Sequence, residues 1–164
     1  MNTLKQSTPG DVGFRAMREE DLDAVMRVET RAYAFAWTRA IFRDCLSSSY
    51  HCLIMYKVGD ADQEHIIGHS VLSAAAGEAH LLNVCVCRDS QGQGYGRKLV
   101  QHMLDLARSL TVEVIFLEVR PSNRAAVELY DSLGFNEIGL RKNYYPAHLG
   151  HEDAKVFALQ LNLD

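Results

Sequence analysis

Three glycines at alternate positions, Gly92, Gly94 and Gly96, are the residues of this sequence best suited to holding a charged ligand. They follow an apolar run at 81–86 and precede an amphipathic stretch, so they lie between a predicted strand and a predicted helix. Glycine lets the backbone approach a ligand closely, and the first N–H groups of a helix have no partner within it. With the positive end of the helix and the adjacent Arg97, these groups predict an anion site. A plain glycine-rich turn is the alternative interpretation.

Two better-known phosphate-binding motifs do not fit this segment. A Walker loop ends in Gly-Lys followed by serine or threonine, whereas Gly96 is followed by Arg97 and Lys98. A dinucleotide fingerprint has a third glycine three residues after the second, and Arg97 occupies the place three residues after Gly94. That fingerprint also usually follows the first strand of its fold, and here the fourth predicted strand precedes the glycines. Neither class of nucleotide site therefore explains the segment.

Glu118 has a side chain suited to accepting a proton. It interrupts the apolar, strand-like run 114–119, where an ionised carboxylate is costly unless it is paired or faces a cleft. A general base in a cleft would meet this condition. So would a carboxylate that faces solvent or pairs with Arg120 two residues later, and the residues alone leave these interpretations equally open.

Tyr130 could donate a proton, because a phenol remains protonated at neutral pH. It shares a helix face with Ala126 and Leu133, so spacing alone favours a core aromatic residue over a general acid. The histidines show no metal-type pattern. His65 and His69 are four residues apart, but they lie in a predicted strand and not on a helix, so no metal site is expected.

Apolar periodicity predicts seven strands and four helices around these residues. The strands are predicted over 12–17, 51–58, 66–75, 81–86, 112–119, 135–140 and 155–161. The helices are predicted over 19–32, 38–46, from the glycine segment to about 110, and 123–133, with Thr38 and Asn123 as N-caps and Gly134 as a left-handed C-cap. A polar loop is predicted over 141–153. The order of elements predicts an α/β fold, a mixed sheet with helices on both faces.

Bulk properties limit the possible partners. The 164 residues favour a flexible leader over 1–11 and a single domain over 12–164, and 48% apolar with 23% charged residues is ordinary for a globular protein. A net charge of −4 gives no whole-chain basic signature, so no direct nucleic-acid partner is expected. No apolar stretch approaches the ~20 residues that span a bilayer, so no membrane partner is expected. The cysteines lack metal-type spacing, which favours a reduced, cytoplasmic protein.

Three segments together resemble the GNAT acetyltransferase superfamily. The pattern Gln91-x-x-Gly94-x-Gly96, after the run 82–86, is similar to its acetyl-CoA-binding signature. The other two segments are Leu-Glu-Val-Arg-Pro-Ser-Asn at 117–123 and Leu-Tyr-Asp-Ser-Leu-Gly-Phe at 129–135. The combination is far more specific than the glycine pattern by itself.

Further segments resemble the RimI group of this superfamily, the bacterial ribosomal-protein-alanine N-acetyltransferases. These segments lie at 31–38, 141–146 and 152–154, and the resemblance extends from about residue 14 to residue 161. The sequence departs from the group at Ala36, where proline is usual, at Gly92, where arginine is common, and at Cys85 and Cys87, where small aliphatic residues are more frequent. The change at Gly92 removes one possible phosphate partner.

The resemblance implies an enzyme that moves an acetyl group from acetyl-CoA, its co-substrate, directly to a protein α-amino group, with no metal. The N-terminal alanine of small-subunit ribosomal protein eighteen is the expected acceptor. A lysine side chain or a small amine is an alternative acceptor, and a non-catalytic acetyl-CoA-binding module is an alternative of another class. The resemblance implies Glu118 as the base and Tyr130 as the acid. A monomer or weak dimer is expected.

The resemblance also assigns residues to the two substrates. The residues expected to bind acetyl-CoA are Val84, Cys85, Val86, Gly92, Gln93, Gly94, Tyr95, Gly96, Arg97 and Asn123. Helix capping alone would also explain Asn123. The residues expected to bind the acceptor are Tyr33, Trp37, Tyr144, Tyr145 and Glu152. For those in the predicted loop 141–153, a solvated loop is the alternative, although an acidic group would suit a cationic N-terminus.

Overall fold

A computed structural model describes residues 12–162, so the expected leader over 1–11 lies outside the described residues. The strands are β1 (Val12–Ala16), β2 (His51–Val58), β3 (Glu64–Ala75), β4 (Glu78–Val86), β5 (Val114–Val119), β6 (Asn136–Pro146) and β7 (His151–Gln160). The helices are α1 (Leu22–Ala32), α2 (Arg39–Ser47), α3 (Tyr95–Ser109) and α4 (Arg124–Ser132). Short 3₁₀ turns occupy Glu19–Asp21, Asp60–Asp62 and Arg88–Ser90.

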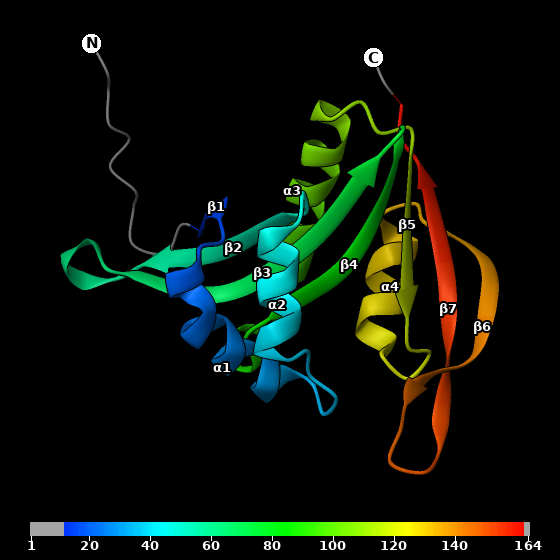
Figure 1. Cartoon of the computed structure of the whole chain (residues 1–164), viewed down its shortest axis with the longest axis horizontal. Coiled ribbons are helices and arrows are strands. Elements are labelled where there is room, and N and C mark those ends of the chain that lie inside the picture. The colour runs from blue at the N-terminus through cyan, green and yellow to red at the C-terminus, as the bar shows by residue number, and fades with distance from the viewer. Residues whose placement is uncertain (1–11, 163–164) are drawn as a thin grey trace.

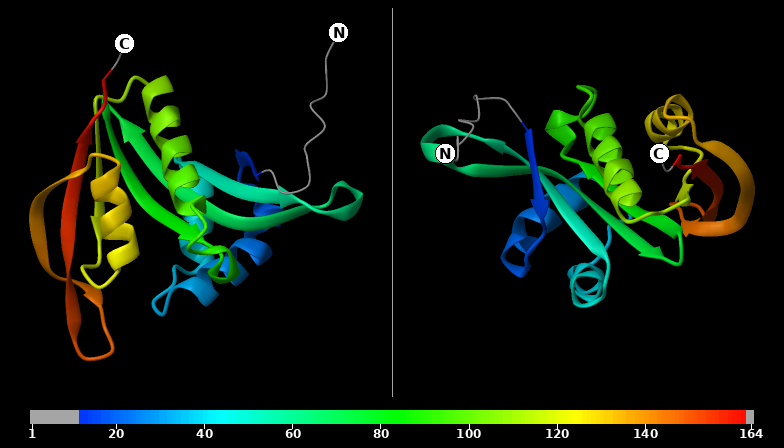
Figure 2. Two further views of the ribbon diagram at one scale, coloured as in Figure 1. Left: turned by 180° about the vertical axis from the view of Figure 1, so that it is seen from behind. Right: turned by 90° about the horizontal axis from the view of Figure 1, so that it is seen from above.

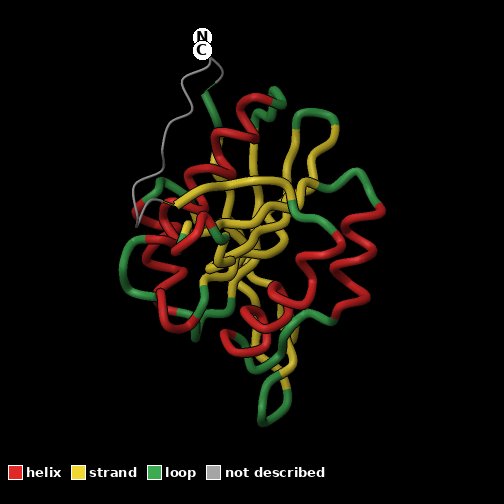
Figure 3. The backbone as a smooth tube through the Cα atoms, turned by 90° about the vertical axis from the view of Figure 1, so that its left-hand side faces the viewer, coloured by secondary structure: helices red, strands yellow, loops and turns green. Residues whose placement is uncertain are grey.

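The seven strands form one sheet in the order β1-β2-β3-β4-β5-β7-β6 (Figure 1). All neighbouring strands are antiparallel except β4 and β5, which are parallel and are joined through α3. Helices α1 and α2 cover one face of the sheet, and α3 and α4 cover the other (Figure 2). A view along the sheet shows helices on both sides of the strands (Figure 3). The prediction of a mixed sheet with helices on both faces is confirmed.

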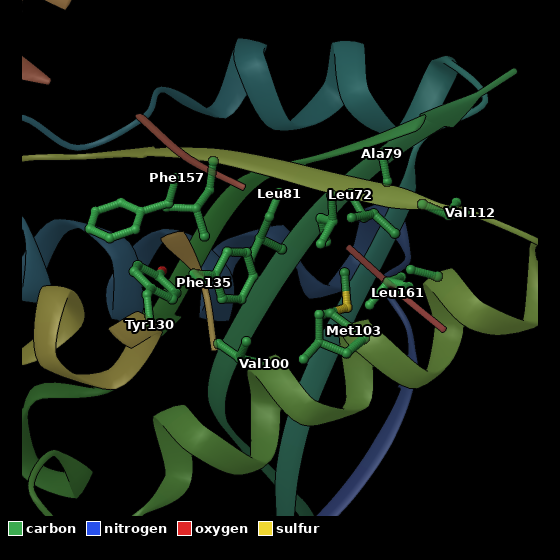
Figure 4. Packing of buried hydrophobic residues seen from close by; sticks show 14 of the residues in the cluster. Leu72, Ala79, Leu81, Val100, Met103, Val112, Tyr130, Phe135, Phe157 and Leu161 are labelled. Carbon is green, nitrogen blue, oxygen red and sulfur yellow. The ribbon is translucent and has the colours of Figure 1, made fainter. Parts of the chain in front are cut away.

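The main core lies between the sheet and the pair α3 and α4 (Figure 4). Helix α3 contributes the apolar stripe expected of an amphipathic helix: Leu99, Val100, Met103, Leu104 and Ala107 are all buried. Fully burying a leucine or methionine side chain stabilises the fold by about 2 kcal/mol, so this stripe fixes α3 against the sheet. A second apolar cluster holds α1 and α2 on the other face. The glycine segment at the start of α3 is therefore attached to a rigid element.

Strands β4 and β5 diverge soon after they meet. They pair only over Glu78–His80 and Val114–Phe116 among the described residues, after which β4 continues along β3 and β5 continues along β7. The register of β3 and β4 also shifts, because Val71 pairs with Asn83 whereas Leu72 pairs with Leu81. This bulge places one extra residue in β4, which bends the strand away from its neighbour. The result is a V-shaped divergence, whose open end faces the start of α3 (Figure 1).

The predicted polar loop over 141–153 is wrong. Strand β6 continues to Pro146 and β7 begins at His151, so the connection spans only 147–150. Strand β6 lies at the edge of the sheet and nearly all its residues are exposed, so polar side chains occupy strand positions there at little cost. A positive φ of 53° at Asn143 and a register shift in this stretch show a bulge within the hairpin. Polar composition therefore did not distinguish an edge strand from a loop.

Candidate active site

The glycine segment forms an open turn at the start of α3. Gly92 and Gly94 have φ angles of +74° and +87°, a region that favours glycine, and a Cβ atom added to either would meet nothing within 4 Å. The first hydrogen bond of the helix runs from the Lys98 amide to the Gly94 carbonyl. The amides of residues 95–97 therefore have no acceptor within the helix. Open space, free donors and the positive helix end fit an anionic group such as a pyrophosphate.

Side chains around this turn fix its shape. The Gln91 amide group donates to the Val86 carbonyl at 3.0 Å, and the Gln93 amide group donates to the Asp89 carbonyl at 3.4 Å. The Arg97 guanidinium donates to the hydroxyl of Ser132 on α4 at 2.6 Å. Gln91 thus ties the turn to the end of β4, and Arg97 ties it to α4.

The third glycine, Gly96, has an ordinary helical conformation. A Cβ atom there would lie 3.6 Å from the side chain of Leu129 on α4, which is a normal contact distance. The ring of Tyr95, the first residue of α3, has the ammonium group of Lys57 at 4.6 Å from its centroid. Asn123 caps α4 by accepting a hydrogen bond from the Ala126 amide at 3.3 Å, as predicted. Direct contacts of these residues with a coenzyme remain a prediction.

The end of β4 lies between the glycine turn and the first helices. The Tyr33 hydroxyl donates to the Val84 carbonyl, and the side chain of Cys85 is buried toward α1, near the Val28 carbonyl. Burial raises the pKa of Tyr33 well above its usual value, and the neighbouring Cys85, Tyr130, Glu29 and Tyr145 raise it further. Tyr33 was predicted to bind the acceptor, and it lies directly against the strand predicted to bind the coenzyme.

Glu118 lies on β5 in an ion network. Its side chain is only 9% exposed; one carboxylate oxygen contacts Nε2 of His80 and the other lies 3.3 Å from Nε of Arg141. The alternative in which Glu118 pairs with Arg120 is wrong. Strand β5 ends at Val119, and Arg120 instead pairs with Glu152 at 3.3 Å. A nearly buried carboxylate needs such partners, because an unpaired ion there would be strongly destabilising.

Tyr130 lies on the opposite face of the sheet from Glu118. Its ring packs against Phe135 and Phe157, with centroids 5.6 Å and 6.4 Å away (Figure 4). Alternate residues of β5, including Leu117, join Tyr130 in the main core, so Glu118 points to the other side. Burial raises the pKa of the Tyr130 phenol far above its usual value, which keeps it protonated at neutral pH. The core interpretation is confirmed, and it is compatible with proton donation.

The hairpin of β6 and β7 is fastened to the end of β5. Glu152 accepts hydrogen bonds from the amide and hydroxyl of Ser122, at 2.9 Å and 3.0 Å, in addition to its pair with Arg120. The Arg120 guanidinium lies 4.4 Å from the ring centroid of Tyr145. The rings of Tyr144 and Tyr145 are 4.8 Å apart, edge to face. Burial, with the nearby Tyr144 and Glu118, raises the pKa of Tyr145 to about 12. Tyr145 is thus held between Tyr144 and Arg120 at the end of β5.

The sequence of this chain is similar to those of known acetyltransferases. The sequence profile of the Acetyltransferase (GNAT) family matches residues 16–135. The chain belongs to the GNAT acetyltransferase family. It is 39% identical to the ribosomal protein bS18-alanine N-acetyltransferase of Salmonella typhimurium over 143 residues, which cover 87% of this chain and 93% of that protein. It is 36% identical to the enzyme of the same name from Escherichia coli K12, over 90% of this chain and 97% of that protein.

The fold agrees with this assignment. The crystal structure of the ribosomal-protein-S18-alanine N-acetyltransferase from Escherichia coli superimposes with a TM-score of 0.83 at 34% identity. The match covers 94% of this chain and 96% of that one. The chain is therefore an N-acetyltransferase that resembles the RimI group over most of its length, as the sequence motifs predicted. Within residues 12–162, no helix is long and apolar enough to cross a membrane.

Acetyl-CoA is the acyl donor of GNAT enzymes, and the residues of the glycine turn fit it. The free amides at 95–97 and the open sides of Gly92 and Gly94 suit a pyrophosphate, as described above. The divergence of β4 from β5 leaves the second edge of β4 without a partner strand beyond His80 among the described residues. Such an edge can pair with an extended, amide-containing chain such as pantetheine.

The sequence prediction missed a buried polar network beneath β4. Glu29 on α1 accepts hydrogen bonds from the Trp37 amide at 3.1 Å and from Asn83, and it contacts Nε2 of His69 at 2.8 Å. Burial raises the pKa of Glu29, but the bonds from His69, Trp37 and Asn83 outweigh it, so the pKa lies below its usual value. Glu29 thus holds the end of the loop 33–37, where Trp37 lies. A charged residue on the apolar face of the predicted helix was the available signal.

Cys85 lies close enough to this network to form a group of metal-ligand type with Glu29 and His69, whose ligand atoms all lie within 4.8 Å of one another. Burial raises the pKa of the Cys85 thiol, which opposes the thiolate that a metal would need. The carboxylate of Glu29 is also already bound by N–H donors. We therefore assign the network to support of the loop 33–37, where the ring of Trp37 packs 5.3 Å from Phe42.

Proposed function

We propose that this enzyme transfers an acetyl group from acetyl-CoA to the N-terminal alanine of ribosomal protein bS18. The proposal is supported by relatives of that name at 36–39% identity, which the chain matches over nearly their whole length. The structural observation that carries it is the arrangement of Glu118 and Tyr130 on opposite faces of the sheet, beside the divergence of β4 and β5. An enzyme that acetylates a ribosomal protein would act in the cytoplasm.

In this proposal Glu118 removes the proton of the attacking amine. An α-amino group has a pKa of about 7.7–8.0, so a carboxylate held in place can deprotonate it, directly or through one water molecule. A lysine side chain, with a pKa of about 10.4, would need a stronger base. The weaker demand of an α-amino group favours a protein N-terminus as the acceptor.

Tyr130 supplies the proton that the sulfur leaving group needs. Bound acetyl-CoA contributes a thioester, an acyl group already activated for attack by an amine. The raised pKa of Tyr130 keeps its proton in place at neutral pH, and its packing against Phe135 and Phe157 fixes the ring. The transfer is direct, with no acyl-enzyme. Base and acid act from opposite sides of the reacting carbonyl, which their separation on the two faces of the sheet allows.

The acceptor N-terminus is proposed to lie between the loop 33–37 and the hairpin of β6 and β7. Both segments present aromatic rings: Phe35 and Tyr145 flank the same guanidinium, that of Arg120, at 5.3 Å and 4.4 Å. Tyr33 and Trp37 are anchored to β4 and to Glu29, respectively. The acceptor would therefore meet a preformed site. We further propose that the enzyme is a monomer or a weak dimer and makes no direct contact with nucleic acid.

Mass spectrometry of peptides incubated with acetyl-CoA and the purified enzyme tests the proposal. One peptide begins Ala-Arg, a second has the same sequence with a blocked N-terminus and an internal lysine, and a polyamine serves as a small amine. We expect acetylation of the free α-amino group only. Modification of the blocked peptide or of the polyamine alone would contradict the proposed acceptor. Binding of acetyl-CoA without turnover of any amine would instead indicate a binding module.

A further inference from the structure

His80 is the partner of Glu118 that can exchange a proton. One oxygen of the Glu118 carboxylate contacts Nε2 of His80, and the other lies 3.3 Å from Nε of Arg141. A guanidinium stays protonated at any pH a protein experiences, so Arg141 can orient the carboxylate but cannot receive its proton. An imidazole gains and loses a proton near neutral pH and has two nitrogens for the purpose. Of the two partners of Glu118, Arg141 can therefore only orient the carboxylate, whereas His80 can also accept its proton.

His80 also lies between Glu118 and solvent. The side chain of Glu118 is 9% exposed, whereas that of His80 is 33% exposed. His80 lines a solvent-open depression of about 360 Å³, together with residues from β3, β4, β5 and the segment after α2, and Glu118 does not line it. A water molecule takes about 30 Å³ of liquid volume, so the depression has room for several waters. A proton on Glu118 thus has a short route to water through the imidazole.

The depression lies away from the proposed acceptor site. It adjoins the paired ends of β4 and β5, where His80 faces Phe116 in the ladder. Farther along β5 comes Glu118, and beyond it Arg120, whose guanidinium donates to the Pro146 carbonyl at the hairpin. Glu118 therefore stands between the acceptor site at the open end of the strands and the depression at their closed end. An acceptor bound at the open end of the strands would keep water away from Glu118 on that side. It would leave the depression at the closed end open to water.

We propose that His80 is a positioning residue through which Glu118 passes its proton to solvent, an inference that rests on the proposed function. Glu118 takes one proton from the acceptor ammonium and transfers it to Nε2 of the His80 ring, which carries its own proton on Nδ1 at this stage. The resulting imidazolium releases its Nδ1 proton to water in the depression, and proton exchange with water then returns the ring to the Nδ1–H tautomer. The net change is one proton moved from the amine to water, and both side chains return to their starting charges.

Replacement of His80 and chemical rescue test this relay in the full-length enzyme. In His80→Ala we expect kcat to fall about 10- to 100-fold, part of the rate that proton transfer typically contributes, with both KM values within about twofold. Free imidazole, which fits the depression and the space left by the side chain, should restore kcat with saturation. In His80→Gln, an amide that can hydrogen-bond to Glu118 but cannot relay a proton, kcat should fall to a similar degree.

Matched controls make the result decisive. His65→Ala removes an exposed histidine at the start of β3, and its kcat should equal that of the wild type with no response to imidazole. Glu118→Gln should not be rescued. Unchanged kcat in His80→Ala, full activity in His80→Gln, or a loss that imidazole does not restore would each overturn the relay. Because any ammonium acceptor must lose a proton, these tests can use whichever amine the wild type acetylates. A wrong acceptor would therefore be distinguishable from a wrong relay.

Discussion

The glycine turn at the start of α3 and the carboxylate site around Glu118 are built in opposite ways. In the turn, the groups available to bind a ligand belong to the backbone: Gly92 and Gly94 leave open space, and the amides of residues 95–97 have no acceptor in the helix. Around Glu118, the interacting groups are side chains: one carboxylate oxygen contacts a nitrogen of His80, and the other lies near a nitrogen of Arg141. The first region is open to a charged ligand, whereas the carboxylate of the second already has partners within the protein.

The two regions therefore contribute to the reaction in different ways. An open turn needs no partner within the protein, because water can hydrogen-bond to its amides until an anion replaces the water. A nearly buried carboxylate needs partners within the protein even before the substrate binds. Changes in the turn should therefore alter coenzyme binding, and changes around Glu118 should alter the rate of the chemical step.

The largest effect is expected for Glu118→Gln. The amide keeps the size of the side chain but cannot accept a proton, so kcat should fall about 10³-fold, within the range of general-base catalysis. Calorimetry should show unchanged acetyl-CoA affinity, because the glycine turn lies elsewhere. Steady-state kinetics with an α-amino peptide measures the first quantity. A variant with wild-type kcat would contradict the assignment of Glu118 as the base.

A smaller loss, about 10²-fold in kcat, is expected for Tyr130→Phe, which removes the phenolic proton donor. The ring still fills the space beside Phe135 and Phe157, so the thermal unfolding midpoint should change little. Tyr56→Phe, at a half-buried tyrosine of β2, is the matched control and should keep full activity. Equal kcat in the two variants would leave Tyr130 with a core role only.

The sequence predicted the open turn better than the carboxylate site, for a physical reason. The turn depends on a few consecutive residues, whose glycines and helix start can be recognised locally. The partners of Glu118 come from other strands: His80 is 38 residues away and reaches it only because β4 and β5 pair in parallel. No local pattern contains that register, so Arg120 was a reasonable but wrong partner.

The hairpin shows a second limit of sequence patterns. Residues 141–146 are polar because β6 is an edge strand, and a polar edge strand resembles a loop in composition. The bulge at Leu81–Asn83 in β4 was equally hidden, since an apolar run with one asparagine gives no sign of a register shift. The order of the elements, by contrast, followed from clear helical and strand periods, and the fold prediction is confirmed.

A moderate effect on acetyl-CoA binding is expected for Gly94→Ala, with Gly96→Ala as the comparison. Gly94→Ala places alanine at a φ of +87°, which costs about 1–2 kcal/mol although nothing blocks the methyl group. The free turn should therefore leave its competent shape, and Kd for acetyl-CoA should rise about tenfold. Gly96→Ala is helical and meets Leu129 at a normal distance, so it should keep Kd and gain about 0.5 kcal/mol in stability.

Calorimetry of coenzyme binding and thermal unfolding of both glycine variants measure these changes. Neither substitution should lower kcat at saturating acetyl-CoA by more than about twofold, because the proton-transfer residues are untouched. Equal Kd values for the two variants would show that backbone conformation does not govern binding at this turn. A large loss of kcat in Gly94→Ala would remove the distinction between a binding region and a chemical region.

The smallest effect is expected from acid at the fastening of the hairpin. Hydrogen bonds from Ser122, with the charge of Arg120, hold the pKa of Glu152 below its ordinary value of 4.5. Because the folded pKa is the lower one, the stabilisation is complete above about pH 4.5 and is lost as the pH falls through the folded value. Hydrogen exchange of the amides at 144–151 should therefore gain no acid-dependent opening between pH 7 and 5, and should show it below pH 4. In Glu152→Gln this acid step should be absent. An acid step that persists in the variant would mean that the hairpin is held by another carboxylate, and the charge balance of the acceptor side would then depend on a group other than Glu152.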